Sequence, residues 1–173
     1  FFLLRFVLEN VLPRLNAPIQ AVMDCTIHLV TQAGNDMAAG TTFGPFMEFC
    51  SVDPKRPKEA LAVVDGSPEK FGILLPYILE AGARIDLEGY CAIAIGYAGH
   101  SSISSRRAAV SALGRLNYAE APHLVDRTLQ LLERAVLDGD DDHLMAMILR
   151  TSLALLRQCA ETCARINHVI KVV

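Results

Sequence analysis

One stretch of the chain decides its fold: RRAAVSALGRLNYAEAPHLVDRTL, residues 106–129. It predicts an alanine-rich helix over about 105–116, a short corner over 117–121, and a second helix over about 122–137 that begins at a proline. Alanine lets neighbouring helices approach closely, and leucine and valine at helical spacing supply an apolar stripe. Two such helices cannot bury their apolar faces alone, so the stretch indicates further helices packed beside them. It points to an extended surface and to no reaction.

The composition of the whole chain favours an all-α globular protein. Of its 173 residues, 52% are hydrophobic and 20% are charged, which is too apolar for a disordered segment. Aromatic residues make up only 6% and tryptophan is absent, so leucine, alanine, isoleucine and valine supply most of the apolar content. Leucine and alanine are strong helix formers. We therefore expect a single helical domain over residues 1–173.

Charge and cysteine content limit the functional classes. A net charge of −3 gives no electrostatic reason to expect a nucleic-acid partner. No segment reaches the roughly 18 uninterrupted apolar residues of a membrane span, and no secretory signal peptide is recognisable. The five cysteines are odd in number and form no dense framework, which is typical of free thiols in the cytoplasm. No glycine-rich nucleotide loop occurs, so we expect no cofactor.

Helical periodicity extends over most of the remaining chain. We expect a helical hairpin over 1–34, in which Pro13 ends the first helix and Gly34 the second. Residues 35–68 hold many glycines and prolines and are expected to form an irregular insertion, with short helices around 44–50 and 57–64. Helix pairs are expected over 69–173, with helices at about 69–81, 87–98, 142–158 and 159–173. Both ends are apolar and the chain does not begin with methionine, which suggests a piece of a longer protein.

The segment Arg107–Leu116, followed by the helix start at Ala121-Pro122, resembles a HEAT-type repeat. The match is clear over about 104–137 and degenerate over about 68–158, while 1–66 do not show it. Asn117-Tyr118 stands where typical members carry a Gly-Asp pair at the corner. Two apolar helix ends, at Arg115 and Arg157, lie 42 residues apart, within the range of HEAT and armadillo repeats. The resemblance implies an α-solenoid of antiparallel helix pairs that binds proteins or regulates an attached domain, and it transfers no catalytic residue.

In such a solenoid, the second helix of each pair would build the concave binding face. The polar side of the helix over 122–137 then becomes the predicted partner-binding site, and the partner is another protein or an attached domain. We expect an interaction or regulatory scaffold without catalysis of its own. The predicted partner-binding residues are His123, Asp126, Arg127, Gln130 and Arg134.

Two alternatives to an interaction scaffold remain open. The chain could be a structural segment that joins domains of a larger protein. It could also be a small α-helical metal- or thiol-dependent enzyme, since Cys159, Cys163 and His168 share one helical face and Cys25 with His28 could complete a zinc site. Buried structural thiols explain these cysteines more simply.

Three shorter patterns have structural explanations. The aspartates at 138, 140 and 142 resemble the start of a calcium loop, but they lack its closing glutamate and are better explained as a helix cap. Residues 99–102, Gly-His-Ser-Ser, resemble a nucleophile elbow only faintly, since no strand precedes them. The basic residues at 55–58 are typical of a solvated tether, although they could contact phosphate or an acidic partner.

Overall fold

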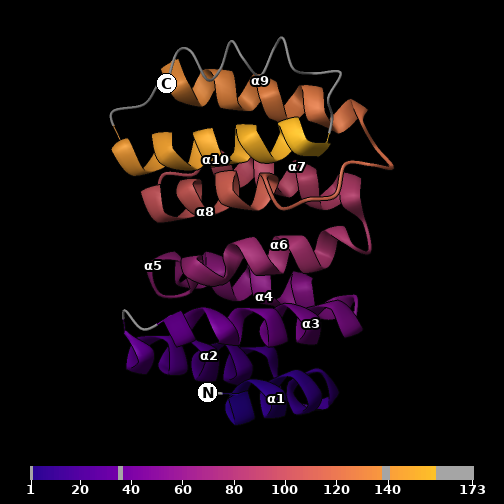
Figure 1. The fold of residues 1–173 in the computed structure, drawn as a ribbon, viewed down its shortest axis with the longest axis vertical. Coiled ribbons are helices and arrows are strands. Elements are labelled where there is room, and N and C mark those ends of the chain that lie inside the picture. Colours follow the sequence, from indigo (N-terminus) through magenta and orange to yellow (C-terminus); the bar gives the residue numbers. More distant parts are fainter. Residues whose placement is uncertain (1, 35–36, 138–140, 159–173) are drawn as a thin grey trace.

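A computed structural model describes residues 2–34, 37–137 and 141–158, and all of its regular secondary structure there is helical (Figure 1). No β-strand occurs in these three ranges, so the prediction of an all-α fold is confirmed. The predicted helix over 159–173 lies outside the described residues, as do Cys159, Cys163 and His168.

Ten α-helices and three 3-10 helices follow one another along the described chain. The 3-10 helices are Leu12–Arg14, Met37–Thr42 and Gly72–Leu74. The α-helices are α1 Phe2–Val11, α2 Ile19–Ala33, α3 Phe43–Val52, α4 Lys55–Gly66, α5 Pro68–Phe71, α6 Leu75–Ala83, α7 Leu87–Ala98, α8 Ile103–Leu113, α9 His123–Leu137 and α10 Asp142–Gln158.

The helices stack along the long axis of the molecule nearly in the order of the chain, from α1 at one end to α9 at the other, with α10 between α8 and α9 (Figure 1). One layer consists of α3, α6, α8 and α10, each packed on the next. A second set of helices packs on this layer: α4 on α6, α7 on α8, and α9 on α10. Each helix therefore contacts mainly its neighbours in the stack, and one face of the α3–α6–α8–α10 layer is left uncovered by the second layer.

The expected irregular insertion over 35–68 is wrong, because most of this segment forms α3 and α4. The predicted short helices around 44–50 and 57–64 are confirmed and are parts of these two. The prolines do not interrupt them: Pro45 and Pro57 each occupy the third position of a helix, and Pro68 the first position of α5. Amides in the first turn have no partner within the helix, so a proline there sacrifices no hydrogen bond.

This segment also supplies part of the hydrophobic core. Phe46, Phe49 and Cys50 of α3 are fully buried, as are Ala60 and Val64 of α4. Burial of a phenylalanine side chain contributes about 1.5–3 kcal/mol. Residues 43–66 are therefore structural members of the stack.

The helix predicted over 69–81 is divided into α5, a 3-10 turn and α6. Pro76 lies in the first turn of α6. Gly82 lies inside α6, and a Cβ added there would come within 2.1 Å of the Tyr90 ring. The glycine is thus required by the close approach of α6 and α7. The segment Leu87–Ala98 is a helix, as predicted, and the Asp86 carboxylate caps it by accepting a hydrogen bond from the amide of Gly89.

The two helices of the 106–129 stretch are present, but they do not form one pair. Helix α8 packs on α7, α6 and α10, whereas α9 packs on α10 and α7. Tyr118, in the connection between α8 and α9, is fully buried, and its hydroxyl donates to the carbonyl of Leu113 at 2.8 Å. The connection thereby crosses from one layer to the other, and α9 becomes the first helix of the next pair.

Candidate functional site

Three adjoining hollows line the exposed face of α5, α6, α8 and α10, and Arg115 borders all of them. We call them together the layer groove. The α8–α10 hollow, of about 240 Å³, is lined by Ser111, Gly114, Arg115, Met147, Arg150, Thr151 and Ala154. The α5–α8 hollow, of about 370 Å³, is lined by Glu69, Gly72, Ile73, Pro76, Tyr77, Ser104, Arg107, Ala108, Ser111, Arg115 and Met147. The α6–α8 hollow, of about 430 Å³, is lined by Glu80, Ala83, Arg84, Leu87, Arg115, Leu116, Asn117 and Glu120.

Tyr77, which lines the α5–α8 hollow, is stacked on the buried ring of Phe43. The rings of Phe43 and Tyr77 are stacked with their centroids 4.5 Å apart, and the guanidinium carbon of Arg115 lies 4.5 Å from the centroid of the Tyr77 ring. Burial is the main reason that the pKa of Tyr77 is raised above its ordinary value, so the phenol stays neutral at physiological pH. The groove therefore presents a flat apolar surface beside a fixed cation.

Two ion pairs cross successive helices of the layer in the same register. Arg84, at the end of α6, binds Glu48 of α3 at 2.7 Å, and Arg115, beyond the end of α8, binds Glu80 of α6 at 2.5 Å. Each joins residues about one helix pair apart in sequence, 36 and 35 positions respectively. We call these two contacts the rungs of the layer.

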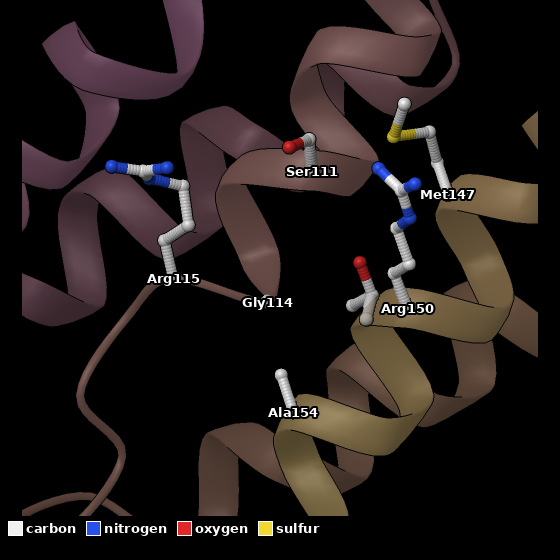
Figure 2. A pocket seen from close by; sticks show the side chains of 7 residues that line it. Ser111, Gly114, Arg115, Met147, Arg150 and Ala154 are labelled. Atoms are coloured by element: carbon white, nitrogen blue, oxygen red, sulfur yellow. The ribbon is translucent and has the colours of Figure 1, made fainter. Parts of the chain in front are cut away.

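The α8–α10 interface lacks such a rung. Ser111 lies four positions before Arg115, just as Glu80 lies four positions before Arg84, so a serine stands where the register places the carboxylate. Across the α8–α10 hollow, the exposed side chain of Arg150 makes no ion pair with any described residue. Figure 2 shows its guanidinium extending toward Ser111 and Met147, while Arg115 turns away to the other side.

Small and hydroxyl side chains hold α8 and α10 together instead. A Cβ added at Gly114 would lie 3.0 Å from the Cα of Thr151, so the two backbones are in close contact. The Thr151 hydroxyl donates to the carbonyl of Val110 at 2.7 Å and satisfies one of the unpaired carbonyls at the end of α8. This interface leaves room for a hollow above it.

A bidentate ion pair closes the other end of the α8–α10 interface. Arg107 binds the carboxylate of Asp141 through Nε at 3.0 Å and Nη2 at 2.6 Å. The same carboxylate caps α10 by accepting hydrogen bonds from the amides of His143 and Leu144. Partial burial acts to raise the pKa of Asp141, but these bonds outweigh it and lower the pKa below its ordinary value. The acidic turn thus acts as a helix cap at Asp141; residues 138–140 are not among the described residues.

The predicted partner-binding residues share one exposed face of α9, and none of them lines the layer groove. His123 contacts Glu88 of α7, with 3.1 Å between Nε2 and Oε1. Because α9 belongs to the layer of α4 and α7, this face lies on a different helix layer from the groove. The groove cannot be recognised from any one segment of the sequence because its residues come from several helices. The recurrence of glutamate and arginine one helix pair apart was the available signal.

The glycine-histidine-serine pattern at 99–102 forms a helix-to-helix turn. The ring nitrogen Nδ1 of His100 accepts from the amide of Ser102, whose hydroxyl caps α8 and donates to Glu69 at 2.8 Å. Tyr97 lines a shallow hollow beside this turn, and the Tyr97 hydroxyl donates a hydrogen bond to the Asp65 carboxylate. Burial and this contact raise the pKa of Tyr97. These partners make the serine a structural cap.

The described cysteines do not form a reactive or metal-binding centre. Burial raises the pKa of Cys50 to about 12 and also raises the pKa of Cys91, so both stay protonated near neutral pH. Cys25 and His28 are exposed. Within the described ranges, no three histidine, cysteine, aspartate or glutamate side chains lie close enough to hold a metal ion.

The basic segment at 55–58 lies in the first turn of α4. Arg56 has a structural role: its guanidinium donates to the carbonyls of Phe49 at 2.7 Å and Leu15 at 2.9 Å and lies 3.9 Å above the Phe49 ring. Only Lys55 and Lys58 remain as exposed cations. The segment therefore joins three elements of the stack.

No family model, no curated protein and no solved structure matches this chain. In the described part of the chain, none of the helices combines the length and apolar character needed to cross a bilayer.

Proposed function

We propose that the chain is a HEAT-like helical scaffold that binds a segment of another protein, or of an attached domain, along the layer groove. One observation carries this proposal: the ion pairs between successive helices of the α3–α6–α8–α10 layer recur at nearly constant sequence separation. Side-chain contacts join residues 36 positions apart between α3 and α6, 35 between α6 and α8, and 34 between α8 and α10. In the second layer, His123 and Glu88 are 35 apart. Such regularity is typical of stacked repeats.

Equivalent residues of the two rungs lie 32 positions apart for Glu48 and Glu80 and 31 for Arg84 and Arg115, whereas the spacing of 42 between Arg115 and Arg157 stays a prediction. HEAT and armadillo repeats span about 40–47 residues. Here α6, α7 and α8 contain only 9, 12 and 11 residues, which shortens the distance along the chain between equivalent contacts. The comparison with HEAT repeats therefore rests on the two layers of paired helices and on the exposed face that they leave.

The composition of the layer groove supports binding of an extended segment. Tyr77, Ile73 and Met147 offer apolar contact area beside several arginines. Ile73 is 52% exposed and lies beside Tyr77 and Met147 in the same hollow, so the three add contiguous apolar area to the groove. Because the groove crosses three successive helices, its shape suits a strand-like or loop segment.

Selection of peptides from a random display library, with the intact protein as target, tests this proposal. We expect the selected peptides to lose most of their affinity for an Ala108→Trp variant, since Ala108 lines the groove, and to retain it for Ala62→Trp, on the exposed side of α4. Circular dichroism and thermal unfolding would verify that both variants fold. Failure to select any peptide would count against the proposal.

The predicted α9 face is the second candidate surface for the same function. Charge reversals there should abolish binding, without changing thermal unfolding, if α9 carries the partner. The residues to change are His123, Asp126, Arg127, Gln130 and Arg134. We expect these variants to bind the selected peptides normally, because none of their side chains lines the groove.

A further inference from the structure

The α8–α10 hollow contains Arg150, which makes no ion pair with a described residue, and Ser111, which stands where α6 has Glu80. From this arrangement we infer that the hollow takes a glutamate or aspartate side chain of an acidic peptide segment, whose carboxylate lies between Arg150 and Ser111. This inference rests on the proposed function and specifies the chemistry of the partner.

The register supplies the first argument. Glu48 and Glu80 each provide a carboxylate to an arginine 36 and 35 positions further along the chain, and the equivalent position on α8 is Ser111. Arg150 lies 39 positions beyond Ser111, and it is the arginine of α10 that lines the same hollow. A hydroxyl cannot neutralise a guanidinium, but it can donate a hydrogen bond to an incoming carboxylate. Ser111 and Arg150 line the same hollow, so one carboxylate can accept from both (Figure 2).

The state of the other arginines supplies the second argument. Arg115 is held by Glu80, and Arg107 is held by Asp141 in a bidentate pair. Arg150 makes no ion pair with a described residue and is the cation of this hollow that remains for a ligand. A partner with one negative charge at this position is therefore complementary to it.

The surroundings favour a carboxylate over a phosphate. Glu69 borders the adjoining α5–α8 hollow, and Glu80 borders the α6–α8 hollow. A phosphate dianion would meet the repulsion of these carboxylates with a single unpaired arginine to offset it, whereas a carboxylate carries half that charge. The hollow of about 240 Å³ is also of a size to hold one side chain.

The apolar part of the groove defines what lies next to the acidic residue. Tyr77, Ile73 and Met147 border the adjoining hollow and offer contact area for an apolar side chain. The axes of packed helices are about 8–10 Å apart, so a peptide that crosses α6, α8 and α10 needs roughly ten residues in extended form. The partner segment would therefore combine an acidic residue with an apolar residue nearby.

The test uses the intact protein and the peptides selected from the random library. We expect their sequences to share a glutamate or aspartate beside an apolar residue. Replacement of that glutamate by glutamine, or Arg150→Gln in the protein, should each weaken binding about tenfold at low salt in fluorescence anisotropy. Both changes together should weaken it little further, because they remove the same contact.

Two variants complete the design. Ser111→Glu places a carboxylate of the chain itself in the α8–α10 hollow and should weaken the acidic peptide about tenfold without lowering the melting temperature. Arg14→Gln, at an exposed arginine beyond α1, is the matched control and should leave affinity within about twofold.

The outcomes separate the two proposals. Suppose that the selected peptides lose affinity for the Ala108→Trp variant but contain no acidic residue, or that Arg150→Gln does not change their affinity. Either result overturns the acidic-segment inference and leaves the proposed scaffold function intact. Tighter binding of a phosphoserine version than of the glutamate version overturns the choice of a carboxylate. If no peptide binds the folded protein, both proposals fail.

Discussion

Within one layer of the stack, α3–α6–α8 and α8–α10 are joined in different ways. The first two interfaces are bridged by the Glu48–Arg84 and Glu80–Arg115 rungs. At the third, Gly114 lies against Thr151, and a hydroxyl-to-carbonyl hydrogen bond replaces the rung. At the two bridged interfaces, the arginine is paired with a carboxylate of the same chain. The third is stabilised by close backbone packing and by the Arg107–Asp141 pair at its other end, and Arg150 makes no ion pair with a described residue there.

At the α8–α10 interface, the groups that stabilise the fold differ from the side chains that we propose for binding. Its backbone contact and its buried hydrogen bond keep the helices together, so the side chains above them are not needed for the fold. Substitutions that disturb the contact should unfold the protein, whereas substitutions above it should alter binding alone.

The largest effect is expected from Gly114→Val. A Cβ at this position would lie 3.0 Å from the Cα and 3.0 Å from the Oγ1 of Thr151, so α8 and α10 would have to separate. Overpacking of this kind costs about 1–3 kcal/mol of unfolding free energy, and urea unfolding would measure it. Gly96→Ala on α7 is the control, since a Cβ there meets nothing within 4 Å and should be neutral or slightly stabilising. Equal stabilities for both variants would contradict the close contact.

Thr151→Val should have the next largest effect. The change preserves the shape of the side chain but removes the donor to the Val110 carbonyl, in a residue that is 2% exposed. A buried carbonyl left without its partner costs roughly 1–3 kcal/mol, and we expect the lower half of that range because the carbonyl lies at a helix end. Thr31→Val, which removes a similar bond on the exposed side of α2, should cost less. Urea unfolding tests this prediction. The midpoint should fall further for Thr151→Val than for Thr31→Val, and equal shifts would contradict the role of the buried hydrogen bond.

Asp141→Asn should destabilise the protein in a way that depends on pH. The pKa of Asp141 in the folded protein lies below its ordinary value of 3.8, which is the value expected in the unfolded chain. The contribution of the carboxylate to the free energy of unfolding is therefore fully present above the unfolded-state pKa. It is lost as the pH falls through the folded-state pKa. We therefore expect the variant to be less stable than the parent protein at pH 7 and pH 5, with a difference that shrinks below about pH 4. Urea unfolding measures the stability of both proteins at each pH. If the stability difference is the same below about pH 4 as at pH 7, the lowered pKa of Asp141 is refuted.

The sequence predicts α7 and α8 well, because each of them has a capping side chain at its start. Asp86 and Ser102 cap α7 and α8 within a position or two of the expected starts. The glycines and prolines over 35–68 predict an irregular segment, and the structure contradicts this prediction with α3 and α4. Their effect depends on position: Pro45 and Pro57 stand in first turns, where they are compatible with a helix.

The pairing of helices and the candidate site were harder to predict. Helical periodicity shows that α8 and α9 each have an apolar face, but it does not reveal which neighbour covers that face. Buried Tyr118 directs the chain into the other layer, and a tyrosine in a corner gives no such signal by sequence alone. The layer groove depends on this crossing, since it brings α10, and with it Arg150, beside α8.

The smallest effect on stability is expected from Glu80→Ser, which makes the second interface of the layer resemble the third. Arg115 loses its carboxylate partner and keeps its place above the Tyr77 ring. Because the Arg115 side chain is 39% exposed, the solvent screens the pair, and the loss of unfolding free energy should stay below about 1 kcal/mol.

Binding should respond to Glu80→Ser in the opposite direction. Arg115 borders all three hollows, so its release adds a second unpaired cation to the groove. Affinity for an acidic peptide should rise about threefold to tenfold at low salt, and the gain should fade as salt is added. Glu59→Ser, on the exposed side of α4, removes the same charge away from the groove and separates this local effect from a change in net charge. An equal gain in both variants would mean that long-range charge, and not the missing carboxylate, governs binding.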